Sequence, residues 1–179
     1  MSGPANLEQK LRVFASRQQP NSGSLYTDGS GGPRWVNELV RPVGASATVI
    51  QWKQNGADWD ISSAGILASS VIGRQSVPRA ETLAATLFPM HSSGTALEHW
   101  FSDCAYTIRG ASDVRKRQSL CRGLNGDVWC MVNDVIGHLP SPQKVKAHVS
   151  LRYVDYDGLR HWFGNLQAAA SAVELYSNR

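Results

Sequence analysis

The sequence predicts a single α/β domain in which helices pack on a mixed five-stranded sheet. Two observations predict this class. Runs of β-branched residues, such as SATVIQW at 46–52, are typical of strands, and after Pro78 apolar residues recur at the spacing of one helix face. The inferred order is strand, strand, strand, helix, strand, helix, helix, strand, helix. At 179 residues the chain is long enough to bury one sizeable core.

The amino-terminal part is expected to hold a tail and three strands. Residues 1–22 end in the polar run that begins RQQPNS and read as a tail or linker, so the folded domain is expected to cover 23–179. SLYTDGSGG, from Ser24, predicts a strand that ends in a Gly-rich turn. The second strand is 46–52, and 57–72 predicts a longer strand interrupted by Gly65.

The rest of the chain is expected to alternate helices with two strands. The first helix follows from buried positions at helical spacing, Ala80, Leu83, Ala84, Leu87 and Phe88. Residues 99–110 predict a strand, 112–118 a basic helix, 128–136 an amphipathic helix, and 143–151 a strand. A final helix is predicted with a buried stripe of Leu166, Ala169, Ala170 and Val173.

Composition narrows the class of protein. The net charge of +4 favours polyanionic partners, because Lys and Arg neutralise phosphates. Three cysteines without a CxxC pair argue against a disulfide framework or a zinc site and indicate a reducing compartment. With no membrane-length apolar run or secretory signal, we expect a soluble, intracellular protein. The signatures of phosphate loops, G-x-S-x-G hydrolases and H-E-x-x-H metalloproteases are absent.

Three acidic residues lie where a carboxylate has to be explained. Asp28 follows an apolar strand and precedes Gly29, where the main chain can approach a ligand closely. Asp103 lies inside a strand-like run, where a charge is costly unless it is paired or metal-bound, and Glu81 lies on the first helix. If these carboxylates meet, their repulsion predicts bound Mg²⁺ or Mn²⁺, since both ions prefer hard oxygen ligands.

Five segments resemble, in order, the motifs of ribonuclease H domains over roughly residues 24–175. YTDGSGG contains Asp28, PRAETLAATL contains Glu81, and SDCAYTIRG contains Asp103. KVKAHVS resembles the family's next strand and its histidine loop, with His148, and GNLQAAASA resembles the start of its closing helix. The flanking sequence is more similar to retroelement-type or diverged cellular members than to bacterial ones. The resemblance implies a ribonuclease H-like fold.

The resemblance also implies an activity. Asp28, Glu81 and Asp103 would hold two Mg²⁺ (or Mn²⁺) ions about 4 Å apart, one activating water and one stabilising the leaving 3′-oxygen. His148 would assist product release or proton transfer. The substrate would be the RNA strand of an RNA/DNA hybrid, contacted near Gly29 and Ser30. The charge run Arg115, Lys116 and Arg117 would be a basic handle for the DNA strand, or only a solvated helix face.

At one position the sequence departs from the family. The closing helix of ribonuclease H domains carries a fourth metal-binding Asp four residues after the Asn matched by Asn165, and this chain has Ala169 there. Three explanations are open: an engineered inactivating substitution, a natural degenerate member, or replacement of the ligand by Asp155 or Asp157 from the preceding loop. The stretch from His148 to Asn165 is also longer than in the family.

Two other functions remain open on the sequence. A catalytically dead module of the same fold would bind nucleic acid or serve as a structural part of a larger assembly, and Ala169 favours it. A DNA-directed nuclease, such as a resolvase or transposase core, would share the acidic cluster without a preference for hybrids. The order of the motifs favours a ribonuclease H-type endonuclease.

Overall fold

A five-stranded mixed sheet forms the centre of the computed structural model, which describes residues 20–31, 43–56, 58–71, 73–92, 94–146 and 156–177. The strands are β1 (Ser22–Gly31), β2 (Val43–Asn55), β3 (Asp58–Ser70), β4 (Ala96–Ser102) and β5 (Pro142–Lys144), in the order β3-β2-β1-β4-β5. β1, β2 and β3 pair antiparallel, whereas β4 is parallel to both β1 and β5. The predicted α/β class and mixed sheet are confirmed.

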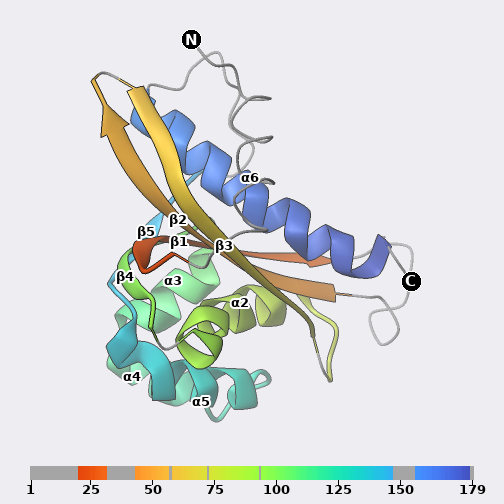
Figure 1. The fold of residues 1–179 in the computed structure, drawn as a ribbon. Coiled ribbons are helices and arrows are strands. Elements are labelled where there is room, and N and C mark those ends of the chain that lie inside the picture. The colour runs from red at the N-terminus through yellow and green to blue at the C-terminus, as the bar shows by residue number, and fades with distance from the viewer. Residues whose placement is uncertain are drawn as a thin grey trace.

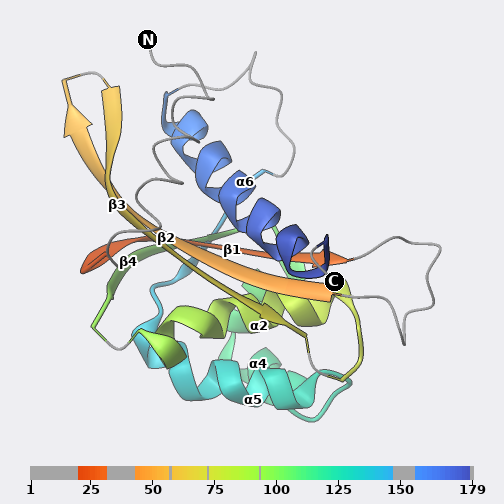
Figure 2. The same ribbon diagram turned by 45° about the vertical axis from the view of Figure 1, so that its right-hand side comes forward.

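Helices cover both faces of this sheet (Figures 1 and 2). They are α2 (Val77–His91), α3 (Ala105–Ser112), α4 (Val114–Leu120), α5 (Gly126–Val135), the 3-10 turn η1 (Ile136–His138) and α6 (Tyr156–Ser177). Among the described helices, α6 crosses one face and α2 to α5 gather on the other. In the described part of the chain, no helix has the length and apolarity that a membrane crossing requires.

Alternation along the strands divides the core into two parts. On β1, Leu25 packs into the cluster beneath α2, and its neighbour Tyr26 packs into the cluster beneath α6. On β4, Trp100 and Phe101 divide in the same way. Successive side chains of a strand point to opposite faces, so Asp28 lies on the same face as Tyr26, toward α6. All four of these core residues are at most 5% exposed.

The segment 99–110, predicted as one strand, divides into β4 and α3 with Asp103 and Cys104 between them. Its aromatic and β-branched residues suggested a continuous strand, but Thr107, Gly110 and Ala111 form a buried helical face. A Cβ at Gly110 would lie 2.1 Å from the Trp129 ring, so glycine lets α3 pack directly on that ring. The prediction was wrong because the contact between Gly110 and Trp129 joins two elements that are separate in the sequence, and local residue patterns do not record it.

The buried stripe predicted for the last helix was also wrong. Leu166 and Val173 are 38% and 39% exposed, and Ala170 is exposed as well. The face against the sheet instead carries Gly164, Ala168 and Ala172, and Ala169 is half-buried beside them. A Cβ at Gly164 would lie 2.5 Å from the Tyr26 ring. Small residues therefore let α6 lie close to the sheet. The large apolar side chains of Leu166 and Val173 did not mark the face of α6 that contacts the sheet.

Several boundaries differ from those expected. β3 passes through Gly65 without interruption, and this glycine is buried against Pro20 and Phe88. The Pro20 carbonyl accepts a hydrogen bond from the Thr95 hydroxyl at 3.0 Å. β5 is only three residues long. Predictions about residues 1–19, residues 147–151 and Asp155 lie outside the described residues.

Candidate metal centre

Asp28 lies near the carboxyl end of β1, the central strand of the sheet. It pairs with Ser46 of β2 on one side, and Thr27, just before it, pairs with Ser102 of β4 on the other. The Thr27 hydroxyl accepts a hydrogen bond of 3.1 Å from the indole Nε1 of Trp100, which is fully buried. Because the strands on both sides hold β1, the position of Asp28 is well constrained.

Asp103 follows the last residue of β4, which runs parallel to β1. The carboxyl ends of parallel neighbours meet at one edge of a sheet, and the Thr27–Ser102 pair brings the next residues, Asp28 and Asp103, together. The Cys104 backbone N–H donates to the Ser102 hydroxyl at 3.1 Å, which turns the chain out of the strand before α3. Asp103 therefore belongs to a strand end, a common place for functional side chains in α/β sheets.

Glu81 reaches the same place from α2. This helix begins at Val77, with Pro78 in its first turn, and buries Glu81 to 6% exposure. A Cβ at Gly29 would lie 2.8 Å from the carbonyl carbon and the Cβ of Ala80, and closer still to the Glu81 nitrogen. Glycine at 29 thus lets β1 touch the first turns of α2. The sequence suggested that Gly29 makes room for a ligand, but the neighbour there is this helix.

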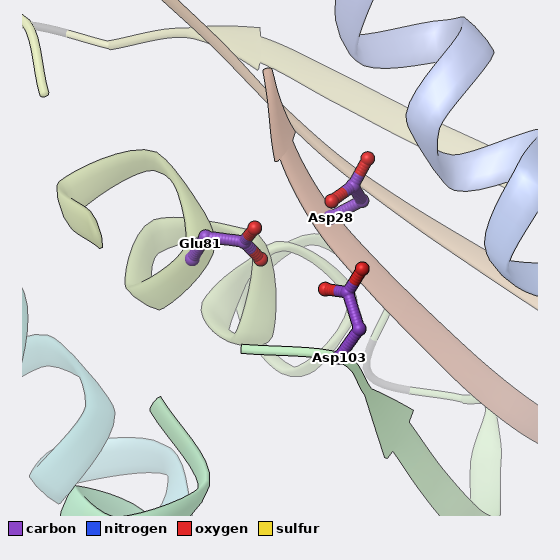
Figure 3. A group of neighbouring side chains, drawn as sticks. All are labelled: Asp28, Glu81 and Asp103. Atoms are coloured by element: carbon purple, nitrogen blue, oxygen red, sulfur yellow. The ribbon is translucent and has the colours of Figure 1, made fainter. Parts of the chain in front are cut away.

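The three carboxylates form one cluster, with ligand oxygens all within 4.8 Å of one another (Figure 3). Burial raises the pKa of Glu81 to about 11, with further contributions from Asp28, the Cys104 thiol and Asp103. The Oε2 atom of Glu81 is buried and has no hydrogen-bond partner in the described part of the chain. Without a counterion, the cluster must hold Glu81 protonated or bear the repulsion.

The residues of this cluster fit a divalent cation. Three carboxylates supply only oxygen donors, the set that Mg²⁺ and Mn²⁺ prefer. A cation would offset the repulsion among them and satisfy the unpartnered Glu81 oxygen. Cys104 was not predicted as a site residue, but it lies near enough to contribute to the raised pKa of Glu81. The only indication of this in the sequence is its position directly after Asp103.

The other predicted site residues are spread more widely. Ser30 is half-buried near the end of β1, and Gly29 is buried. Arg115 and Lys116 are exposed at the start of α4, where their backbone N–H groups donate to the capping carboxylate of Asp113. His148 lies outside the described residues, as does Asp155, and nothing is described of the Asp157 side chain.

Arg117 does not belong to an exposed basic handle. It is 6% exposed, its Nη1 donates to the Ala111 carbonyl at 2.7 Å, and its Nε donates to Asn133 at 3.2 Å. These bonds connect α4 with the end of α3 and with α5. Within the run of three cations only Arg115 and Lys116 face solvent, because adjacent residues on a helix point in different directions.

The sheet order, the placement of α6 on one face and of α2 to α5 on the other, and the acidic cluster at the ends of β1 and β4 define a ribonuclease H-like fold. Solved structures with this fold superpose on most of the chain. LC9-RNase H1, a type 1 RNase H with the type 2 active-site motif, matches with a TM-score of 0.63 at 14% identity, over 90% of this chain and 74% of its own.

Two foamy virus structures are also similar. The prototype foamy virus protease-reverse transcriptase matches with a TM-score of 0.62 at 15% identity, over 89% of this chain but only 22% of the viral one. The solution structure of the PFV RNase H domain matches with a TM-score of 0.53 at 12% identity, over 88% and 97%. At these identities the similarity is one of fold. No family model and no curated protein matches the sequence.

Proposed function

We propose that this domain is a metal-dependent endoribonuclease of the ribonuclease H type, directed at the RNA strand of RNA/DNA hybrids. The observation that carries the proposal is the cluster of Asp28, Glu81 and Asp103 at the ends of β1 and β4 in this fold. Structures named as RNase H share the fold, and the net charge of +4 suits a polyanionic substrate.

The roles of the chain's own residues follow from their positions. Asp28 and Asp103, both half-exposed, would hold divalent metal on the open side of the cluster, and buried Glu81 would close it from α2. When bound, Mg²⁺ or Mn²⁺ supplies an activated water and neutralises charge on the leaving oxygen. Ser30 would contact the hybrid beside Asp28, and Arg115 and Lys116 would bind backbone phosphates. For His148, which lies outside the described residues, the resemblance of KVKAHVS to the histidine loop of ribonuclease H domains implies a role in proton transfer or product release.

Cleavage of a labelled RNA/DNA hybrid in Mg²⁺ or Mn²⁺ tests the proposal. The Ala169→Asp variant is expected to cut the RNA strand, because a fourth carboxylate would return to α6, and the unmodified chain is expected to cut it little or not at all. Adding Asp28→Asn to Ala169→Asp should abolish cleavage while leaving the fold intact. Equal cutting by the unmodified chain and Ala169→Asp would mean that Ala169 is not a lost ligand.

A second candidate function is a catalytically inactive module that binds hybrids or serves as part of a larger assembly. The observation that favours it is the composition of the cluster: among the described residues it holds three acids and none from α6, where Ala169 lies half-buried. Tight hybrid binding by both the unmodified chain and Ala169→Asp, with no cleavage by either, would support this module and overturn the nuclease.

A further inference from the structure

Asn165, on α6, carries a buried amide oxygen that has no hydrogen-bond partner among the residues that the structure describes. The side chain is 9% exposed, and its Oδ1 is fully buried. Buried polar atoms are almost always paired, so an unpaired one needs an explanation, such as a bound ion or an ordered water. Glu81 Oε2, in the acidic cluster, is unpaired in the same way. The two atoms come from helices on opposite faces of the sheet (Figure 2).

The contacts of α6 indicate which part of the sheet Asn165 covers. One turn earlier, the His161 ring lies 4.1 Å from the Phe101 ring, and its Nδ1 is 3.3 Å from the Tyr26 hydroxyl. Tyr26 precedes Asp28 by two residues on the same face of β1, and Phe101 precedes Asp103 by two.

The direction of α6 relative to β1 and β4 also indicates where Asn165 lies. Figures 1 and 2 show α6 crossing the sheet obliquely, with its carboxyl end toward the same side of the molecule as the carboxyl end of β1, and β4 is parallel to β1. Four residues of helix advance about 6 Å, and two residues of strand advance about 6.6 Å. The step from His161 to Asn165 therefore goes toward the end of β1 that carries Asp28. Asn165 lies on the β4 side of α6, since its neighbour Phe163 packs against Trp52 of β2 on the other side.

We infer that the Asn165 amide oxygen is the ligand that α6 contributes to the cation held by Asp28, Glu81 and Asp103, directly or through one coordinated water. The inference rests on the proposed metal-dependent function. An amide oxygen is a hard, neutral donor that divalent cations accept alongside carboxylates. It would supply the coordination that Ala169 lacks without adding a fourth negative charge to a cluster that already repels itself.

Mn²⁺ binding to the full chain, measured by calorimetry and by the electron paramagnetic resonance of bound Mn²⁺, tests this role. Asn165→Leu should lower the Mn²⁺ affinity by about tenfold, the size seen for supporting groups at metal sites. Its melting temperature in EDTA should equal or exceed that of the unmodified chain, because the lost amide oxygen had no partner. Adding Ala169→Asp to Asn165→Leu should restore the affinity.

Gln167→Leu is the matched control. Gln167 is on the same helix and equally buried, at 6% exposure, but lies one turn from Phe163 on the β2 side. The Gln167→Leu variant should bind Mn²⁺ with the same affinity as the unmodified chain. Asn165→Asp, which keeps the shape of the side chain, should bind Mn²⁺ more tightly and covers the case in which Asn165→Leu fails to fold.

The outcomes separate the inference from the proposed function. Mn²⁺ binding that is lost in Asp28→Asn but unchanged in both Asn165→Leu and Asn165→Asp would overturn the role of Asn165 and leave the metal centre standing. A melting temperature in EDTA that falls for Asn165→Leu, with unchanged Mn²⁺ affinity, would make Asn165 structural. Absence of Mn²⁺ binding to the unmodified chain and to Ala169→Asp would overturn the metal centre itself.

Discussion

Glu81 shows how one buried carboxylate links the site to stability. Its pKa is about 11 in the folded protein against an ordinary value of 4.5, because burial and the neighbouring acids disfavour the charged form. The folded protein therefore keeps a proton that the unfolded chain releases above pH 4.5. Without metal, the free energy of unfolding falls as the pH rises from about 4.5 toward the folded value.

Glu81→Gln removes this penalty, because glutamine has nearly the same shape and no proton to lose. In EDTA the variant should be about as stable as the unmodified chain at pH 4.5 and more stable at pH 8, with a difference that grows by up to about 1.4 kcal/mol for each pH unit. Urea unfolding at pH 4.5, 6 and 8 measures the difference. Glu98→Gln, on the exposed part of β4, is the control, and a gap for Glu81→Gln that does not widen with pH would contradict the prediction.

Arg115 and Lys116 differ from Arg117 in what they are free to contact. If the exposed pair binds phosphates, the double change to alanine should weaken hybrid binding and reduce the slope of log K against log salt by about 2, one for each contact. Fluorescence anisotropy over a salt series measures the slope. Lys53→Ala, an exposed cation near the hairpin end of β2, serves as the comparison, and equal slopes for the two variants would refute the handle.

At the level of elements, the contact between β1 and α2 positions the site. Gly29 is the point where they touch, since no room exists there for a Cβ beside Ala80 and Glu81. Two residues earlier in α2, Arg79 is held by a bidentate ion pair with Asp127 of α5, in which Nη1 donates to Oδ1 at 2.6 Å and Nη2 donates to Oδ2. The first turn of α2 is thus held between the sheet and α5.

Gly29→Ala should separate β1 from α2 and move Glu81 away from the two aspartates. Overpacking of this kind typically costs about 1–3 kcal/mol, so we expect a lower melting temperature together with weaker Mn²⁺ binding. Thermal unfolding and calorimetry measure the two effects. Gly137→Ala is the matched control, because a Cβ there meets nothing within 4 Å. Mn²⁺ affinity unchanged by Gly29→Ala would show that this contact does not position Glu81.

Over the whole molecule, the acidic cluster ties the sheet to the layer beneath it. Asp28 and Asp103 come from the sheet and Glu81 from α2, so a cation bound by all three would connect the sheet with the helices on one of its faces. A ligand that binds only the folded chain raises its stability according to its concentration and affinity.

Mg²⁺ at about 100 times its dissociation constant should therefore add ~2.7 kcal/mol of stability, which for a domain of this size raises the melting temperature by roughly 5–11 °C. Differential scanning calorimetry with and without Mg²⁺ measures the shift. Asp28→Asn should largely abolish it, whereas Asp134→Asn, which changes an exposed acid on α5, should not. An equal Mg²⁺ shift in both variants would place the bound ion elsewhere.

Residue type and local periodicity, both readable in the printed sequence, were enough for the α/β class and for the helix that carries Glu81. They also singled out Asp28, Glu81 and Asp103, whose carboxylates the structure brings together. They failed where a contact distant in sequence decides the outcome. Gly110 lets α3 pack on Trp129, and the end of the predicted strand 99–110 is therefore helical. Gly164 lets α6 pack on Tyr26, so the face of α6 that contacts the sheet is not the one predicted.

The carboxylates and their order along the chain belong to the sequence alone, because they are matters of residue identity and spacing. Only the tertiary structure brings their oxygens within 4.8 Å of one another, raises the pKa of Glu81 and buries the unpaired oxygen of Asn165. The physical reason is that the pairing of β1 with β4, and the packing of α2 and α6 on them, join residues far apart in the chain, and no local pattern records such contacts.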